Sequence, residues 1–271
     1  MVQKIWTIVF LLLAAGVGLQ ATETENLNIN VLPAKKPIKV DGDIEDWDLS
    51  GGVLICSDVE NLRTRMGTWI HVMYDAKNLY VLSRWLDETP MSHPGSIAGD
   101  FGWSGDSLQL RIIAGDKVNN QDMICWVTAW RDRDGKDVVD LDFPRKQLKH
   151  IKDAKTKGAQ QAFKVTADGK GYIQEIALPW SVLTPKPFVP KAGGRIKFSV
   201  EPNFNTSSNF RISMKGIFQP GEVPDRVFTF SSVRTWGFGM LQAKGNIEPQ
   251  KLRLADRSEE RRVGKECATG C

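Results

Sequence analysis

The 271-residue sequence has few of the residues that bind metal ions or perform nucleophilic catalysis. Its four cysteines and three histidines form no Cys-x-x-Cys pair and no Cys/His spacing typical of a zinc site. It contains no Gly-x-Ser-x-Gly motif, no His-Glu-x-x-His motif and no glycine-rich phosphate-binding loop. Carboxylates are numerous, but no pair stands in the apolar surroundings that raise the pKa of a glycosidase acid. We therefore expect a protein that is not an enzyme by itself.

Strong charge of one sign is also missing. The formal net charge is +4, and it falls to +2 without Lys4 and the last 15 residues, which carry four basic and three acidic side chains. The basic residues are scattered along the chain rather than grouped in a stripe. This composition does not predict binding to nucleic acid.

The two ends of the chain differ from the rest. Residues 1–21 contain one lysine, an apolar run at 5–17 that is short for a membrane span, and small residues around Ala21. This pattern is typical of a cleaved signal peptide, with an uncleaved membrane anchor as the alternative. We expect a secreted or periplasmic protein without membrane insertion after cleavage. Residues 257–271 resemble a translated sequencing adapter, so the natural chain is expected to continue beyond Asp256; a solvated basic tail is the alternative.

Two cysteines remain between these ends, Cys56 and Cys125, each in an apolar run of the kind found in strands. In an oxidising compartment they could form a disulfide, or they could stay as two separate buried thiols. Both alternatives are compatible with the sequence.

The middle of the chain shows the signals of β-strands and no convincing helical periodicity, apart from one turn at residues 179–183. Residues 68–74 and 79–86 predict a hairpin that turns at 75–78. Further strands are expected at 106–114, 123–131, 162–167, 171–179, 195–204, 210–216, 226–230 and 239–243. Many short strands predict one all-β domain, an antiparallel β-sandwich at 38–256, with residues 22–37 as a lead-in.

Six motifs follow one another in this region: PIKVDGDIEDWD, VMYDAKNLYVLSRWLDETP, GWSGDSLQLRI, GYIQEIALPWSVL, RIKFSVEPNFN and RTWGFGML. Their order over residues 38–241 resembles the family 9 carbohydrate-binding modules, which belong to the DOMON-like β-sandwiches with a jelly-roll-like arrangement. The resemblance implies a non-catalytic module that binds a poly- or oligosaccharide. Such a module is expected to be part of a longer carbohydrate-active protein with a fused C-terminal domain.

The resemblance also implies where the sugar lies. Family members hold a sugar against a tryptophan three residues before the aspartate of the DS strand, which here is Trp103 before Asp106. The polar ligand contact three residues after that aspartate is Gln109. The second stacking tryptophan of the family has no counterpart in FTFSSV. Trp236 either substitutes for it or closes the core.

Strand alternation adds further candidates. In DSLQLRI, Gln109 and Arg111 share the polar face, opposite the leucines. In CWVTAWR, Trp126 and Trp130 project from one face, about 13 Å apart along the strand. They form either an exposed binding platform or part of the core.

The segment VEPNFN contributes another set of polar groups. Glu201, Asn203 and Asn205 alternate along it and either bind hydroxyl groups or belong to an edge turn.

The acidic stretch VDGDIEDWD does not fit an EF-hand, because Asp46 occupies the glycine position and Gly52 the glutamate position. We expect residues 38–40 to end the first strand, Asp41 and Gly42 to form a turn, and Trp47 to pack against the sandwich. The carboxylates would then lie on a surface loop. Asp41, Asp43 and Glu45 are the candidates for a weak structural calcium site, and no other cofactor is expected.

Two other functions remain open. Some DOMON-like proteins bind haem b through methionine with histidine or lysine, and Met91 and His93 follow a strand in a loop that could reach a cofactor. A second axial ligand would have to come from Met123 or His71. Alternatively, the domain docks to another part of a larger secreted protein.

Overall fold

The structure is a computed structural model that describes residues 22–94, 102–115, 120–146, 148–207, 211–219 and 232–255. The expected signal peptide, the expected tail at 257–271 and the expected strand at 226–230 lie outside these described residues. Within them, no helix is both long and apolar enough to cross a lipid bilayer.

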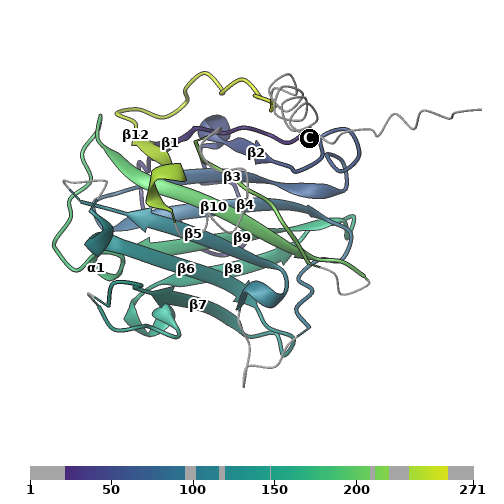
Figure 1. The fold of residues 1–271 in the computed structure, drawn as a ribbon, viewed down its shortest axis with the longest axis horizontal. Helices are drawn as coiled ribbons and strands as arrows, with labels where there is room; N and C mark the ends of the chain where they lie inside the picture. The colour runs from purple at the N-terminus through teal and green to yellow at the C-terminus, as the bar shows by residue number, and fades with distance from the viewer. Residues whose placement is uncertain are drawn as a thin grey trace, which may run out of the picture.

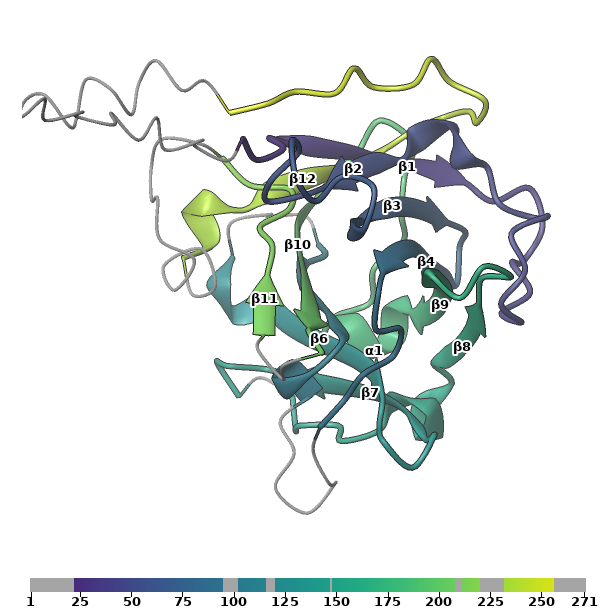
Figure 2. The same ribbon diagram turned by 90° about the vertical axis from the view of Figure 1, so that its right-hand side faces the viewer.

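Twelve strands of the described residues form one sheet, which folds back on itself into a β-sandwich (Figures 1 and 2). This confirms the all-β prediction. The hydrogen-bonded order is β7-β6-β5-β10-β12-β1-β3-β4-β9-β8, with β11 attached to β10 and β2 to β3. The strands are β1 (Asn28–Pro33), β2 (Val53–Ile55), β3 (Met66–Tyr74), β4 (Asn78–Asp87), β5 (Ser107–Ile113), β6 (Ile124–Arg131), β7 (Asp137–Asp142), β8 (Gln160–Val165), β9 (Gly171–Pro179), β10 (Arg195–Asn205), β11 (Arg211–Ser213) and β12 (Gly237–Leu241).

Helical structure is short, as the sequence predicts. The one α-helix of the described residues is α1 (Trp180–Leu183), where a single turn was expected. The 3-10 turns are η1 (Leu49–Gly51), η3 (Gly102–Ser104), η4 (Gln121–Met123), η5 (Ala154–Lys157) and η6 (Val233–Thr235).

The predicted hairpin is formed by β3 and β4, which pair antiparallel from Met66–Asp87 to Tyr74–Leu79. The Asp75 carboxylate closes the turn by accepting hydrogen bonds from the backbone N–H groups of Lys77 and Asn78, both at 2.7 Å. An aspartate at the start of a turn stabilises it in this way.

Strand β1 lies in the segment expected to be a lead-in, yet it occupies the middle of the sheet. It pairs parallel with both β12 and β3, whereas the other pairings are antiparallel. Ile29 and Val31 are fully buried in the main core. The alternation of asparagine with apolar residues at 28–31 is a strand signal in the sequence. The segment therefore contributes directly to the stability of the domain.

The main core lies between the two layers and draws alternate residues from both. Leu108, Leu110 and Ile112 of β5 enter it together with Cys125, Val127 and Ala129 of β6. The predicted alternation in these two strands is confirmed. Because successive side chains of a strand point to opposite faces, the polar residues of β5 and the tryptophans of β6 lie on the outward face.

The acidic stretch forms a loop rather than the end of a strand, so the expectation of a strand at residues 38–40 is wrong. The reason is that β1 has already entered the sheet before this loop begins. The loop instead covers the outer face of the layer that contains β3, β4 and β9. Gly42 adopts a positive φ of 84°, and Trp47 is buried, as predicted. The buried Glu175 of β9 holds the loop by accepting hydrogen bonds from Trp47 Nε1 (2.5 Å) and from the N–H groups of Asp41 (2.9 Å) and Gly42.

Cys56 and Cys125 are both free thiols and both buried, which decides between the two alternatives left open by the sequence. Cys56 follows β2 in one layer, whereas Cys125 lies on β6 in the other. Burial raises the pKa of both thiols.

Candidate functional site

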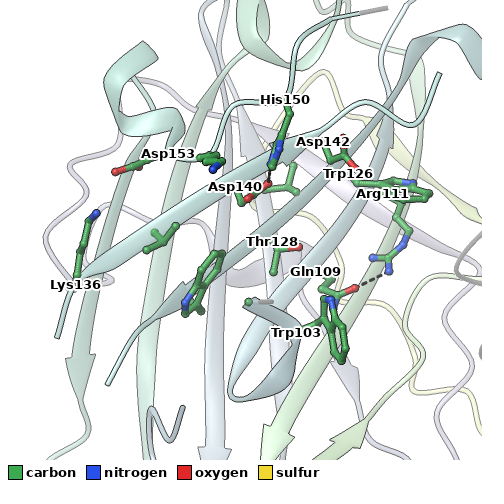
Figure 3. A pocket seen from close by; sticks show the side chains of 15 residues that line it. Trp103, Gln109, Arg111, Trp126, Thr128, Lys136, Asp140, Asp142, His150 and Asp153 are labelled. Carbon is green, nitrogen blue, oxygen red and sulfur yellow. Dashed lines mark hydrogen bonds and ion pairs between the residues drawn. The ribbon is translucent and has the colours of Figure 1, made fainter. Parts of the chain in front are cut away.

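A cleft of about 570 Å³ lies over the outward face of β5, β6 and β7 (Figure 3). Gln109 and Arg111 of β5 line it together with Trp126 and Trp130 of β6. Trp103 of the turn η3 completes this group. The structure therefore brings five of the predicted site residues together around one cavity.

Among the large apolar side chains that line the cleft, Trp103 is the most exposed, with 44% of its surface accessible. Its position depends on Gly102, which packs directly on Thr128 and on the ring of Trp130. A Cβ at Gly102 would lie only 2.8 Å from Thr128 Cγ2 and would overlap the Trp130 ring. Only glycine lets the turn approach the sheet this closely, so Gly102 sets the distance between Trp103 and the floor of the cleft.

His93 lies behind this turn and supports it. Its ring stacks on Trp130 with 6.1 Å between ring centroids, and its Nε2 lies 3.3 Å from the Gly102 carbonyl oxygen. Gly105 leaves room for it, because a Cβ there would stand 2.7 Å from His93 Cα. His93 is 5% exposed and does not line the cleft. Its packing is that of a residue that positions the Trp103 turn.

The other residues considered for haem lie apart from the cleft as well. Met91 Sδ is 3.9 Å from Arg131 Nη1, and Met123, the last residue of η4, packs in a small core cluster with Val233 of η6. His71 is buried on β3, in the other layer. None of these three residues lines the cleft, and haem binding stays a prediction.

Gln109 and Arg111 belong to a buried polar row. Arg111 Nη2 donates a 2.6 Å hydrogen bond to Gln109 Oε1 and lies 3.5 Å from Glu201 Oε2 (Figure 3). All three residues are 6% exposed or less. Glu201 stands directly opposite Gln109 in the β5–β10 pairing. The amide oxygen and the carboxylate hold the Arg111 guanidinium in place and compensate its charge inside the protein.

Of the two alternatives for residues 201–205, an edge turn is excluded, because this part of β10 is a strand paired with β5 and β11. Asn203 is fully buried and donates to Ser107 Oγ at 3.2 Å. Asn205 Nδ2 donates to Ser92 Oγ at 2.9 Å. Neither asparagine lines the cleft, and both support the strands beneath it.

Trp126 and Trp130 share the cleft-facing side of β6, as predicted, but differ in exposure. Trp126 is partly exposed, whereas Trp130 is only 6% exposed beneath Gly102. Trp236 is fully buried and packs with Ile113 and Ile124 outside the cleft. Of the two alternatives for Trp236, the structure therefore favours closing of the core.

The far wall of the cleft was not predicted, because β7 was missed. It is formed by Lys136, Val138, Asp140, Asp142, His150, Lys152 and Asp153. The alternation of Val139 and Leu141 with the two aspartates is the signal that could have revealed this strand. His150 Nε2 lies 2.7 Å from Asp140 Oδ1, and burial raises the pKa of Asp140.

Two buried carboxyl groups, Asp87 and Asp106, interact with each other where β4 ends and β5 begins. Burial raises the pKa of both groups, and the charge of Asp87 raises the pKa of Asp106 further. The Asp106 oxygens accept from the N–H groups of Ser92 and Asn205, each at 2.6 Å. The pair therefore keeps a proton at pH values at which an exposed carboxyl group is already ionised. Both groups are 4% exposed or less, so this pair is structural.

The calcium candidates have other partners. Asp41 pairs with Lys39 at 2.5 Å and Asp43 with Lys164 at 3.2 Å, while Glu45 is exposed. Among the described residues, no group of three or more histidine, cysteine, aspartate or glutamate side chains could hold a metal ion.

No protein-family model and no curated protein matches the sequence. Solved structures, however, match the fold. A family 9 carbohydrate-binding module from Caldicellulosiruptor kristjanssonii, in complex with cellotriose, aligns with a TM-score of 0.54 at 16% identity, over 83% of this chain and 99% of the module. The same organism's module in complex with glucose aligns with a TM-score of 0.53 at 15% identity, over 82% and 98%.

A structure from Bacteroides uniformis aligns with a TM-score of 0.52 at 7% identity, over 80% of this chain and its full length. At sequence identities this low, the alignments establish the fold of the chain alone. The protein thus has the β-sandwich fold of the family 9 carbohydrate-binding modules.

Proposed function

We propose that the protein is a carbohydrate-binding module that holds a sugar against Trp103. The observation that carries this proposal is the position of Trp103, which stands 44% exposed at the wall of a cleft with a polar floor. A flat aromatic ring packs well on the C–H face of a pyranose, and a large exposed indole is otherwise unfavourable on a protein surface.

The floor of the cleft supplies groups suited to sugar hydroxyls. Gln109 and Arg111 line it and are already held in place by their mutual hydrogen bond. Preorganised polar groups lose little side-chain entropy when they bind a ligand. Trp126, which is partly exposed, adds a second aromatic side chain to the cleft lining on β6.

The proposal includes the wider setting of the domain. The protein is exported, and the domain binds without catalysis as part of a longer carbohydrate-active protein. A structural calcium ion near Asp41, Asp43 and Glu45 belongs to this proposal as an optional component. The fold shared with known sugar-binding modules supports the binding role.

A pair of tryptophan variants tests the site. Trp103→Ala should weaken binding at least tenfold on a glycan array that is positive for the wild type, because aromatic anchors contribute most of the binding energy. Trp69→Ala is the matched control, since Trp69 is 38% exposed on β3 in the other layer. Unchanged binding by Trp103→Ala, or an equal loss in both variants, would contradict the proposed site.

A further inference from the structure

The positive charge of the protein is concentrated at one place, beside the cleft. Residues 145–157 carry six basic side chains and one acidic side chain, a net charge of +5 with histidine neutral. The whole chain carries +4, so the remaining residues together carry −1. The basic residues are Arg145, Lys146, Lys149, Lys152, Lys155 and Lys157, and the acidic one is Asp153. Strong local charge of this kind attracts ligands of opposite sign.

This segment is held against β7 at the rim of the cleft. Ile151 and Leu141 exchange two backbone hydrogen bonds of 2.9 Å, which form an isolated antiparallel bridge. Side chains alternate about such a bridge, so His150 and Lys152 share the side opposite Ile151. Both line the cleft. The turn η5 then anchors the segment through Ala154, which is fully buried.

A second cationic group reaches the same wall from the turn between β6 and β7. Lys136 is exposed and lines the cleft, and Figure 3 shows Lys136 and His150 across the cleft from Trp103. The aromatic surface and the basic rim therefore border one cavity from different sides.

Three aspartates line this wall beside Lys136 and Lys152, and two of the three, Asp140 and Asp153, lie next to another basic side chain. Asp140 lies 2.7 Å from His150, and burial raises the pKa of Asp140, although His150 and Lys152 act in the opposite direction. Asp153 caps η5 and lies 4.0 Å from Lys155 Nζ. Asp142 is exposed and accepts from the N–H of Phe143. Among the ion pairs of the described residues, none involves Lys136 or Lys152.

We propose that the cleft selects an acidic polysaccharide, with a sugar ring against the tryptophans and a carboxylate or sulfate group against Lys136 and Lys152. The proposal rests on the carbohydrate-binding function proposed above and names its ligand class. Each ammonium group at an exposed rim contributes modestly, but a polymer presents repeated negative charges to several lysines at once.

Matched polymers separate charge from sugar recognition. The wild-type chain is assayed by isothermal titration calorimetry at about 50 mM salt, where surface charges are incompletely screened. Polygalacturonate is compared with its methyl ester, and dextran sulfate with dextran. The first pair tests carboxylates and the second tests sulfates. Duplex DNA is included as a polyanion without exposed pyranose rings.

The variant Lys136→Gln/Lys152→Gln removes the two cleft-lining ammonium groups. Lys36→Gln/Lys77→Gln removes the same charge from exposed positions in the other layer. We expect at least one acidic polymer to bind about tenfold more tightly than its neutral counterpart. The cleft variant should lose this preference, and the control variant should keep it.

Three results would overturn this inference: equal affinity for acidic and neutral polymers, equal losses in the two double variants, or binding of DNA as tight as that of the acidic polymers. The first of these leaves the carbohydrate-binding function intact, because neutral sugars still bind in a manner sensitive to Trp103→Ala. Absence of binding to every polysaccharide overturns both proposals.

Discussion

His71 should make the stability of the protein depend on pH. It lies on β3, 3% exposed, with its ring stacked on Trp69 at 6.4 Å between centroids and packed against Gly52. Burial, followed by the positive charge of Arg84, lowers the pKa of His71 from 6.5 to about 4. The buried ring is therefore neutral in the folded protein near neutral pH, whereas the unfolded chain takes up a proton at higher pH.

The sign and size of the effect follow from this difference. Because the folded-state pKa is lowered, the stabilising contribution is complete above pH 6.5 and is lost as the pH falls toward 4. Between pH 7.5 and pH 4.5 the free energy of unfolding should decrease by about 2.5 kcal/mol through this group alone, at 1.36 kcal/mol per pKa unit.

The variant His71→Gln removes the titrating group. Urea unfolding followed by tryptophan fluorescence at several pH values gives the free energy of unfolding of both proteins, and the other titrating groups cancel in the difference. The wild type should lose about 2.5 kcal/mol more than the variant between pH 7.5 and pH 4.5. Arg84→Gln should reduce the slope of the wild type in part, because it removes the neighbouring charge and leaves the ring buried. Parallel curves for the wild type and His71→Gln would refute the reasoning.

Two further predictions concern buried groups. Asp87→Asn removes one carboxyl group of the buried pair. Because burial and the charge of Asp87 raise the folded-state pKa of Asp106 to about 9, the wild type loses stability as the pH rises from about 4 toward 9. The variant should therefore gain in melting temperature relative to the wild type between pH 5 and pH 8.5, and a difference that does not change with pH would contradict the raised pKa. Asp106→Asn should lose about 1–3 kcal/mol of stability at all pH values because a backbone N–H loses its acceptor; an unchanged free energy of unfolding would contradict this role. Cys56 and Cys125 should resist alkylation in the native protein and react after unfolding without reductant, as measured by peptide mass spectrometry; a requirement for reductant would indicate a disulfide.

The sequence alone determined the class of the fold and the facing of individual strands. Strand periodicity is a local property, because adjacent side chains in an extended chain point to opposite sides. For this reason the predictions placed Gln109 and Arg111 on one face of β5, and Trp126 and Trp130 on one face of β6, and the structure confirms both. The hairpin of β3 and β4 was predictable for the same reason.

Only the tertiary structure decided which of these faces is open to a ligand. Trp103 and Trp236 are both tryptophans near glycines, yet one is 44% exposed and the other fully buried, because exposure depends on neighbours distant in the sequence. The run of basic residues at 145–157 can be read in the sequence, but only the bridge between Ile151 and Leu141 brings His150 and Lys152 to the rim of the cleft. Local patterns specify where a side chain points along its own strand, whereas packing between strands specifies what it faces.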